Sequence, residues 1–230
     1  MINRRDFIKF TTLGPIGAII SSQGFTITEN NLPRVLIIGD SISIGYYTFV
    51  KLALLNKVDI SRPMSTNGEF ENCAGTTKGV ENISKWLGES SWDLIHFNFG
   101  LHDIKHINPI TRKNSMSFDD PHQASPDQYE KNLNEIVKVL KKTKAKLIFA
   151  TTTPYPNSKL KPARKPGMHK IYNQIALNIM KKHKVKINDL HGFVLPRMNE
   201  LQRPHNVHFS EYGSKELAKV VVKSILQNLY

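Results

Sequence analysis

Residues 34–45 read RVLIIGDSISIG, and this stretch joins an apolar run, a tight polar loop and the start of a helical pattern. RVLII (34–38) is short and rich in branched apolar residues, which is typical of a strand that is buried on both faces. Ile44, Tyr47, Val50 and Leu54 then recur with helical spacing through 43–55. A strand that passes directly into a helix is the building unit of a parallel α/β sheet.

The same alternation continues to the end of the chain. Further strands are predicted at 58–61, 93–99, 146–151 and 185–189. Helical spacing occurs at 76–87, 125–142, 168–183 and 210–229, with Ser125 and Ser210 as candidate N-caps. We therefore expect a three-layer α/β/α sandwich around a parallel sheet of about five strands. In such sheets functional groups gather in the loops beyond the carboxyl ends of the strands.

The chain length of 230 residues fits one domain, and no internal repeat is visible. Residues 1–22 are predicted to be an export signal of twin-arginine type, because Arg4 and Arg5 precede an apolar stretch (11–20) too short for a comfortable membrane span. An ordinary amphipathic helix is the alternative. Residues 23–33 are expected to be a linker and 34–230 the functional domain. The protein is then exported to the periplasm or beyond the cell, with no stable membrane span unless the signal stays uncleaved.

The formal net charge of +13 favours encounters with polyanions. Lysine tracts such as KKTKAK (141–146) are also explained as solvated helix ends, where the helix dipole favours cations. No nucleic-acid-binding motif accompanies the charge, so no nucleic-acid partner is expected. Cys73 is the only cysteine, which excludes an intrachain disulfide and a cysteine-based metal site.

Ser41 follows the first predicted strand and stands at the turn into a helix. A serine in such a turn is exposed, and backbone N–H groups lie beside it to stabilise an oxyanion. The G-x-S-x-G pattern is not met because Ser43 occupies the second glycine position, and the glycine spacing of a phosphate-binding loop is absent. A serine-capped helix start without chemistry is the alternative. Gly75, which precedes another predicted helix, offers a free N–H aided by the helix dipole.

Four segments together resemble the SGNH hydrolases, the GDSL-like family of serine esterases and lipases. These are GDS at Gly39–Ser41, the glycine at Gly75, GLHD at Gly100–Asp103 and HNVH at His205–His208, and the resemblance covers most of 34–229. It implies the flavodoxin-like SGNH fold and a serine esterase that needs no cofactor and no metal. Ser41 is then the nucleophile and His208 the general base. The oxyanion hole is formed by Ser41, Gly75 and His102.

Two positions depart from the family pattern. The third block has His102 where the family has asparagine, although an imidazole N–H can also donate and Asn98 is a second candidate. The last block has His205 where the family has the carboxylate that orients the base. We expect His205 to act in the catalytic group, and three outcomes stay open. Ser41 and His208 could work unaided or with a backbone carbonyl, a carboxylate such as Asp103 or Asp189 could take over, or activity is lost.

Two other functions compete with the esterase hypothesis. His102, Asp103, His205 and His208 could converge on a metal ion, although no H-E-x-x-H signature is present. A non-catalytic, exported glycan-binding protein would explain both departures. For the esterase, the long loops 104–125 and 152–167 are expected to shape the substrate site. The hypothesis for the substrate is a small-molecule or polysaccharide ester, with O-acyl carbohydrate as the favoured class. Because 152–167 is basic, acidic carbohydrate is included, and lipids and small acyl esters stay open.

Overall fold

The computed structural model describes residues 32–230. The export signal predicted for 1–22 and residues 23–31 of the predicted linker lie outside the described residues.

Five parallel strands form one sheet in the order β2-β1-β3-β4-β5. This order confirms the predicted three-layer α/β fold and is the flavodoxin-like order. β1 lies beside the centre, with Ile38 paired to Phe97 of β3, and its last four residues are buried, as expected for a run of branched apolar side chains. The strands are β1 (Arg34–Ile38), β2 (Asp59–Ser61), β3 (Leu94–Phe97), β4 (Lys146–Ala150) and β5 (Lys186–Asn188).

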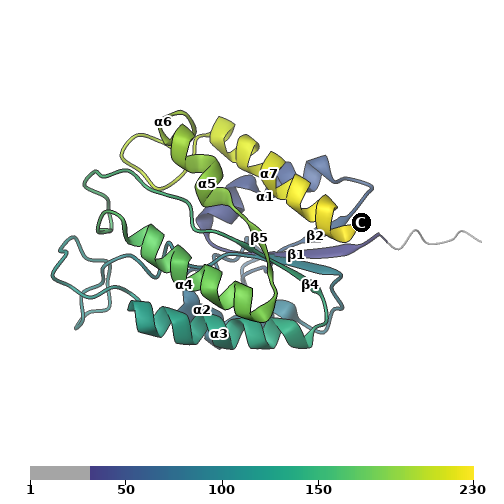
Figure 1. Cartoon of the computed structure of the whole chain (residues 1–230), viewed down its shortest axis with the longest axis horizontal. Helices are drawn as coiled ribbons and strands as arrows, with labels where there is room; N and C mark the ends of the chain where they lie inside the picture. The colour runs from purple at the N-terminus through teal and green to yellow at the C-terminus, as the bar shows by residue number, and fades with distance from the viewer. Residues whose placement is uncertain (1–31) are drawn as a thin grey trace, which may run out of the picture. The chain divides into compact units, whose positions relative to one another are not determined.

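Helices cover both faces of the sheet (Figure 1). α1 (Ser41–Ala53) packs against α7 (Glu211–Leu229) on one face, and α3 (Pro126–Lys142) packs between α2 (Thr76–Leu87) and α4 (Met168–His183) on the other. Three short helical segments that the sequence pattern did not reveal follow β5. They are α5 (Leu190–Val194), η1 (Leu195–Arg197) and α6 (Met198–Leu201), and each is too short to show a helical period.

The helix starts are fixed by caps that the sequence supplies. Ser125 and Ser210 cap α3 and α7 by accepting the backbone N–H of Gln128 and Gly213, which confirms both predicted caps. α1 begins at Ser41, two residues before the predicted segment 43–55, because the buried Asp40 side chain accepts the N–H of Ile42 at 2.9 Å. The helix N-terminus therefore lies immediately beyond the carboxyl end of β1.

The loops after β1, β3 and β4 leave the same edge of the sheet, as parallel pairing requires. Gly100, after β3, has a φ of +150°, and a Cβ at this position would lie 2.1 Å from Thr152 Oγ1. Glycine at this position lets the loops after β3 and β4 approach each other closely. Across residues 32–230, no helix combines the length and apolar character needed to cross a membrane.

Candidate active site

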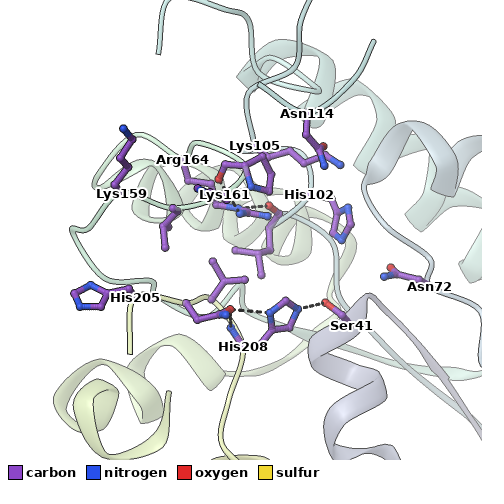
Figure 2. A pocket seen from close by; sticks show the side chains of 15 residues that line it. Ser41, Asn72, His102, Lys105, Asn114, Lys159, Lys161, Arg164, His205 and His208 are labelled. Atoms are coloured by element: carbon purple, nitrogen blue, oxygen red, sulfur yellow. Dashed lines mark hydrogen bonds between the residues drawn. The ribbon is translucent and has the colours of Figure 1, made fainter. Parts of the chain in front are cut away.

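The hydroxyl of Ser41 lies at the N-terminus of α1 and faces a histidine from the far end of the chain. Ser41 Oγ is 2.9 Å from Nε2 of His208, which lies 167 residues later. Both side chains line one pocket, together with residues of the loops after β3 and β4. The fold therefore brings the predicted nucleophile and the predicted base within hydrogen-bond distance at the carboxyl edge of the sheet (Figure 2).

The other ring nitrogen of His208 contacts Asn206. Nδ1 is 2.8 Å from Asn206 Oδ1, and the same oxygen accepts the backbone N–H of His208 at 3.0 Å. An amide oxygen can only accept, so we assign the ring proton to Nδ1. Nε2 is then unprotonated and can accept the hydroxyl proton of Ser41. This is the tautomer that a general base requires.

His205 does not take the place expected for it. The segment from Arg203 to His208 is a tight turn, closed by the bridge between Gln202 and Phe209 and by the bond from Arg203 N–H to the carbonyl of His208. His205 adopts a left-handed φ of +52° in this turn and is exposed. Its ring points away from His208 (Figure 2), whereas the Asn206 amide points towards it. The expected contact between His205 and the base is therefore made by Asn206.

Neither carboxylate that we considered as a substitute contacts His208. Asp103 Oδ1 accepts the N–H and the hydroxyl of Thr76 at 2.8 and 2.6 Å. Asp189 Oδ1 accepts the hydroxyl of Thr151 at 2.8 Å and caps α5 through the N–H of Gly192. Both acids therefore hold loops and helix ends in place.

Asn206 was not predicted from the sequence, although the sequence contains a signal for it. In an Asx turn, the side-chain oxygen of an asparagine accepts the backbone N–H of the residue two positions later. The segment N-V-H at 206–208 forms this turn, which brings the amide oxygen beside the ring of the histidine. Matching the family spacing D-x-x-H instead directed attention to His205.

The predicted oxyanion hole is formed only in part. The N–H of Ser41 has no acceptor among residues 32–230, and neither has the N–H of Gly75. Ser41 and His102 line the pocket, but Gly75 is not part of its wall. A Cβ on Gly75 would lie 2.9 Å from Asp103 Oδ1, so this glycine allows α2 to pack against the loop after β3. Asn98 is not an oxyanion donor either, because its amide donates to the carbonyl of Ala150 at 2.7 Å.

Asn72 was not predicted and lines the pocket with Ser41. Its Oδ1 accepts the N–H of Ala74 at 3.0 Å, which fixes the orientation of the amide. Nδ2 then has no acceptor among the described residues. The pocket therefore contains a side-chain amide donor, as the family pattern leads one to expect, but it comes from the loop before α2.

His102 is held as a neutral ring. Burial, followed by the positive charges of Lys105 and Arg164, lowers its pKa to about 3. Nδ1 is buried without a partner, so Nε2 is the nitrogen left to face the pocket. We place the single proton on Nε2, because an N–H buried without an acceptor costs more than an unused lone pair. His102 is then a second side-chain donor beside Ser41.

The pocket has a volume of about 530 Å³ and carries positive charge. Four cationic side chains line it, namely Lys105, Lys159, Lys161 and Arg164, and no aspartate or glutamate does. Burial lowers the pKa of His208, and the charges of Arg164 and Arg203 lower it further. The base is therefore neutral at physiological pH and available to accept a proton.

The metal alternative requires His102, Asp103, His205 and His208 to converge. Within 32–230, no group of three or more His, Cys, Asp or Glu side chains is arranged to hold a metal ion. His208 instead uses its two ring nitrogens on Ser41 and Asn206.

Comparison with known proteins agrees with this geometry. Residues 35–221 match the family model of the GDSL-like lipase/acylhydrolases. The match spans most of the chain, and the protein therefore belongs to the GDSL-like lipase/acylhydrolase family, whose fold is that of the SGNH hydrolases. No curated protein matches the sequence.

Solved structures share the fold at low sequence identity. A lipase/acylhydrolase from Enterococcus faecalis aligns with a TM-score of 0.65 and 20% identity over 84% of this chain and 95% of its own. The acetyl xylan esterase AlAXEase aligns with a TM-score of 0.62 and 15% identity over 84% of this chain and 99% of its own. An acetylxylan esterase from Geobacillus stearothermophilus aligns with a TM-score of 0.61 and 16% identity over 84% of this chain and 94% of its own.

Proposed function

We propose that the protein is a serine esterase that hydrolyses carboxylic esters through an acyl-enzyme on Ser41. The observation that carries this proposal is the aligned set of Ser41 Oγ, His208 and Asn206, with contacts of 2.9 and 2.8 Å. A serine that is hydrogen-bonded to an unprotonated Nε2, whose ring is in turn oriented by a third group, is the arrangement that activates a hydroxyl.

In the first half of the reaction, Ser41 Oγ attacks the acyl carbonyl while His208 Nε2 takes its proton. The oxyanion is stabilised by the Ser41 N–H and by the side chains of His102 and Asn72. His208 then donates its proton to the alcohol oxygen as the ester bond breaks, and the acyl group stays on Ser41. In the second half, His208 takes a proton from water as the water oxygen attacks the acyl carbonyl. The bond to Ser41 Oγ then breaks, His208 returns the proton to Oγ, and the carboxylic acid leaves.

Asn206 orients the ring but does not neutralise the imidazolium that forms during attack. A carboxylate would do both. We therefore propose that His208 is a base of modest strength. Such a base suits an activated ester, or a substrate whose negative charge helps to stabilise the imidazolium. O-acyl groups on carbohydrate are the substrate class that we favour, because the pocket is much larger than an acetyl group, most of its lining residues are polar, and structural neighbours include acetyl xylan esterases. We further propose that the protein is exported, on the strength of the signal-like pattern in residues 3–20.

The test is hydrolysis of p-nitrophenyl acetate by the wild type and by Ser41→Ala, each with and without EDTA. We expect activity in the wild type that EDTA does not change, and a loss of roughly 10³-fold or more in the variant. Equal rates in the two proteins would support the binding-protein alternative. Loss in EDTA with recovery on adding zinc would support the metal alternative.

A further inference from the structure

Arg164 is a buried cation without an anionic partner. Only 5% of its surface is exposed, yet it forms no ion pair with any of residues 32–230. Its Nε donates to the carbonyl of Leu101 at 3.0 Å and its Nη1 to that of Pro162 at 3.4 Å. Burying a guanidinium without a counter-ion is costly, and most proteins avoid it.

The guanidinium is aimed into the pocket that holds Ser41 and His208. The two carbonyls fix its plane and leave Nη2 without an acceptor among the described residues. A fixed guanidinium with a free N–H edge matches the geometry of carboxylate, sulfate and phosphate.

Three lysines extend the charge of Arg164 along one side of the pocket. We call Lys105, Lys159, Lys161 and Arg164 the cationic wall, and Figure 2 shows it across the pocket from Ser41 and His208. None of its lysine ammonium groups forms a hydrogen bond or an ion pair with residues 32–230. Lys159 and Lys161 are exposed, whereas Lys105 is half-buried.

Nothing else that lines the pocket balances this charge. Its wall holds no carboxylate, and even the residue that orients His208 is an amide. Asp40 and Asp103 lie nearby but are fully enclosed, where they cap α1 and hold Thr76. Arg164 is the buried cation that faces this pocket, so we expect its compensating negative charge to come from the ligand.

We propose that the cationic wall is an anion-binding subsite, and that the natural substrate is an ester whose sugar carries a carboxylate, sulfate or phosphate group. The claim about the substrate rests on the proposed esterase function. The claim that the cationic wall binds an anion does not depend on catalysis. Arg164 binds two oxygens of the anion, and Lys105 and Lys161 approach it from the rim. The wall then selects acidic over neutral acylated sugars.

The experiment compares four substrates that share one sugar frame. They are the mono-O-acetylated methyl glucoside, its 6-sulfate, its 6-phosphate and the matching methyl glucuronoside, and acetate release is measured for each. We expect kcat/KM to favour at least one anionic sugar by roughly 10- to 100-fold, since hydrogen bonds to charged groups are the strong ones. The anion with the highest value identifies the source of the charge.

Variants test whether the preference comes from the wall. In Arg164→Gln and in the exposed Lys161→Gln, the ratio of anionic to neutral kcat/KM should fall towards one. Lys138→Gln is the matched control, because this exposed lysine lies on α3 and does not line the pocket. It should leave the ratio unchanged. A wild type that hydrolyses the neutral sugar as fast as all three anionic sugars, or a preference that persists in both wall variants, would overturn the proposal.

A measurement of sugar binding tests the anion site separately from the proposed esterase activity. If no sugar is hydrolysed, calorimetry on Ser41→Ala at low salt measures binding of the unacetylated methyl glucuronoside, 6-sulfate, 6-phosphate and neutral glucoside. Binding of an anionic sugar that is lost in the Lys161→Gln background would retain the anion site and reject the esterase. Equal or undetectable binding of all four would reject the anion site.

Discussion

Asn206→Asp is the substitution that most directly tests how His208 is held. The amide oxygen lies 2.8 Å from Nδ1 of His208, and an aspartate in the same position places a full negative charge there. Asn206 Nδ2 has no acceptor among the described residues, so replacing it with oxygen breaks no internal hydrogen bond. The backbone bond from His208 N–H to Oδ1 is retained.

The size of the effect follows from Coulomb's law. With the charge centres about 4 Å apart, the attraction is about 1 kcal/mol at the dielectric constant of water and about 4 kcal/mol at an effective value of 20. For a half-buried pair, the pKa of His208 should therefore rise by roughly 1 to 3 units. A stronger base also transfers the serine proton more readily, so the rate on the alkaline plateau should increase about tenfold.

The assay is the pH profile of kcat/KM on p-nitrophenyl acetate. Because the base must be neutral, raising its pKa moves the acid limb to higher pH. Asn206→Asp should be slower than wild type at low pH and faster at high pH, so the two curves should cross. Asn206→Ala, which leaves Nδ1 without an acceptor, should lose roughly 10²-fold or more at every pH.

His205→Asp is the matched control, since it restores the family spacing D-x-x-H on a side chain that points away from the base. We expect little change in its profile. An acid limb that moves in His205→Asp and stays fixed in Asn206→Asp would refute the assignment of Asn206.

Three further predictions follow from the site and the loops around it. In the wild type, burial and nearby arginines lower the pKa of His208, so kcat/KM should rise with pH through a midpoint below about 6.5 and be flat at neutral pH; a midpoint above 7 would contradict this. Asn72→Ala and His102→Ala should each lower kcat by roughly 10²-fold with little change in KM, as loss of an oxyanion donor does; a change confined to KM would assign these residues to substrate binding. Gly100→Ala should lower the free energy of unfolding in urea by about 2–4 kcal/mol, because its Cβ meets Thr152 Oγ1 at a positive φ. Gly68→Ala is its control, with a φ of +81° and open space around it, and should cost only about 1–2 kcal/mol.

The fold was predictable because its signals are local. β1 and β4 are short runs of branched and aromatic residues, and their buried patterns match the predicted segments closely. α2 and α4 begin and end at the predicted residues, because their apolar stripes lie within the segments themselves and a glycine precedes each helix. Strand-to-helix alternation then leaves few topologies.

The pairing of Ser41 with His208 was predictable from the resemblance to the SGNH hydrolases, in which these blocks precede the first and the last helix. Asn206 was missed despite its Asx-turn signal, because the family spacing pointed to His205, and only the left-handed backbone at His205 shows that this side chain faces away from the base. Arg164 was predicted only as part of a basic loop. Its burial depends on carbonyls of Leu101 and Pro162, and contacts between loops leave no periodic pattern in the sequence.

The central claim is that Ser41 is a nucleophile activated by His208. It is tested most directly by labelling the protein with a fluorophosphonate, which forms a bond to an activated serine oxygen and releases fluoride, and by mapping the adduct with mass spectrometry. We predict one adduct, on the peptide that contains Ser41, and slow labelling in His208→Ala. No adduct at Ser41, together with esterase activity that persists in Ser41→Ala, would show that Ser41 is not the nucleophile.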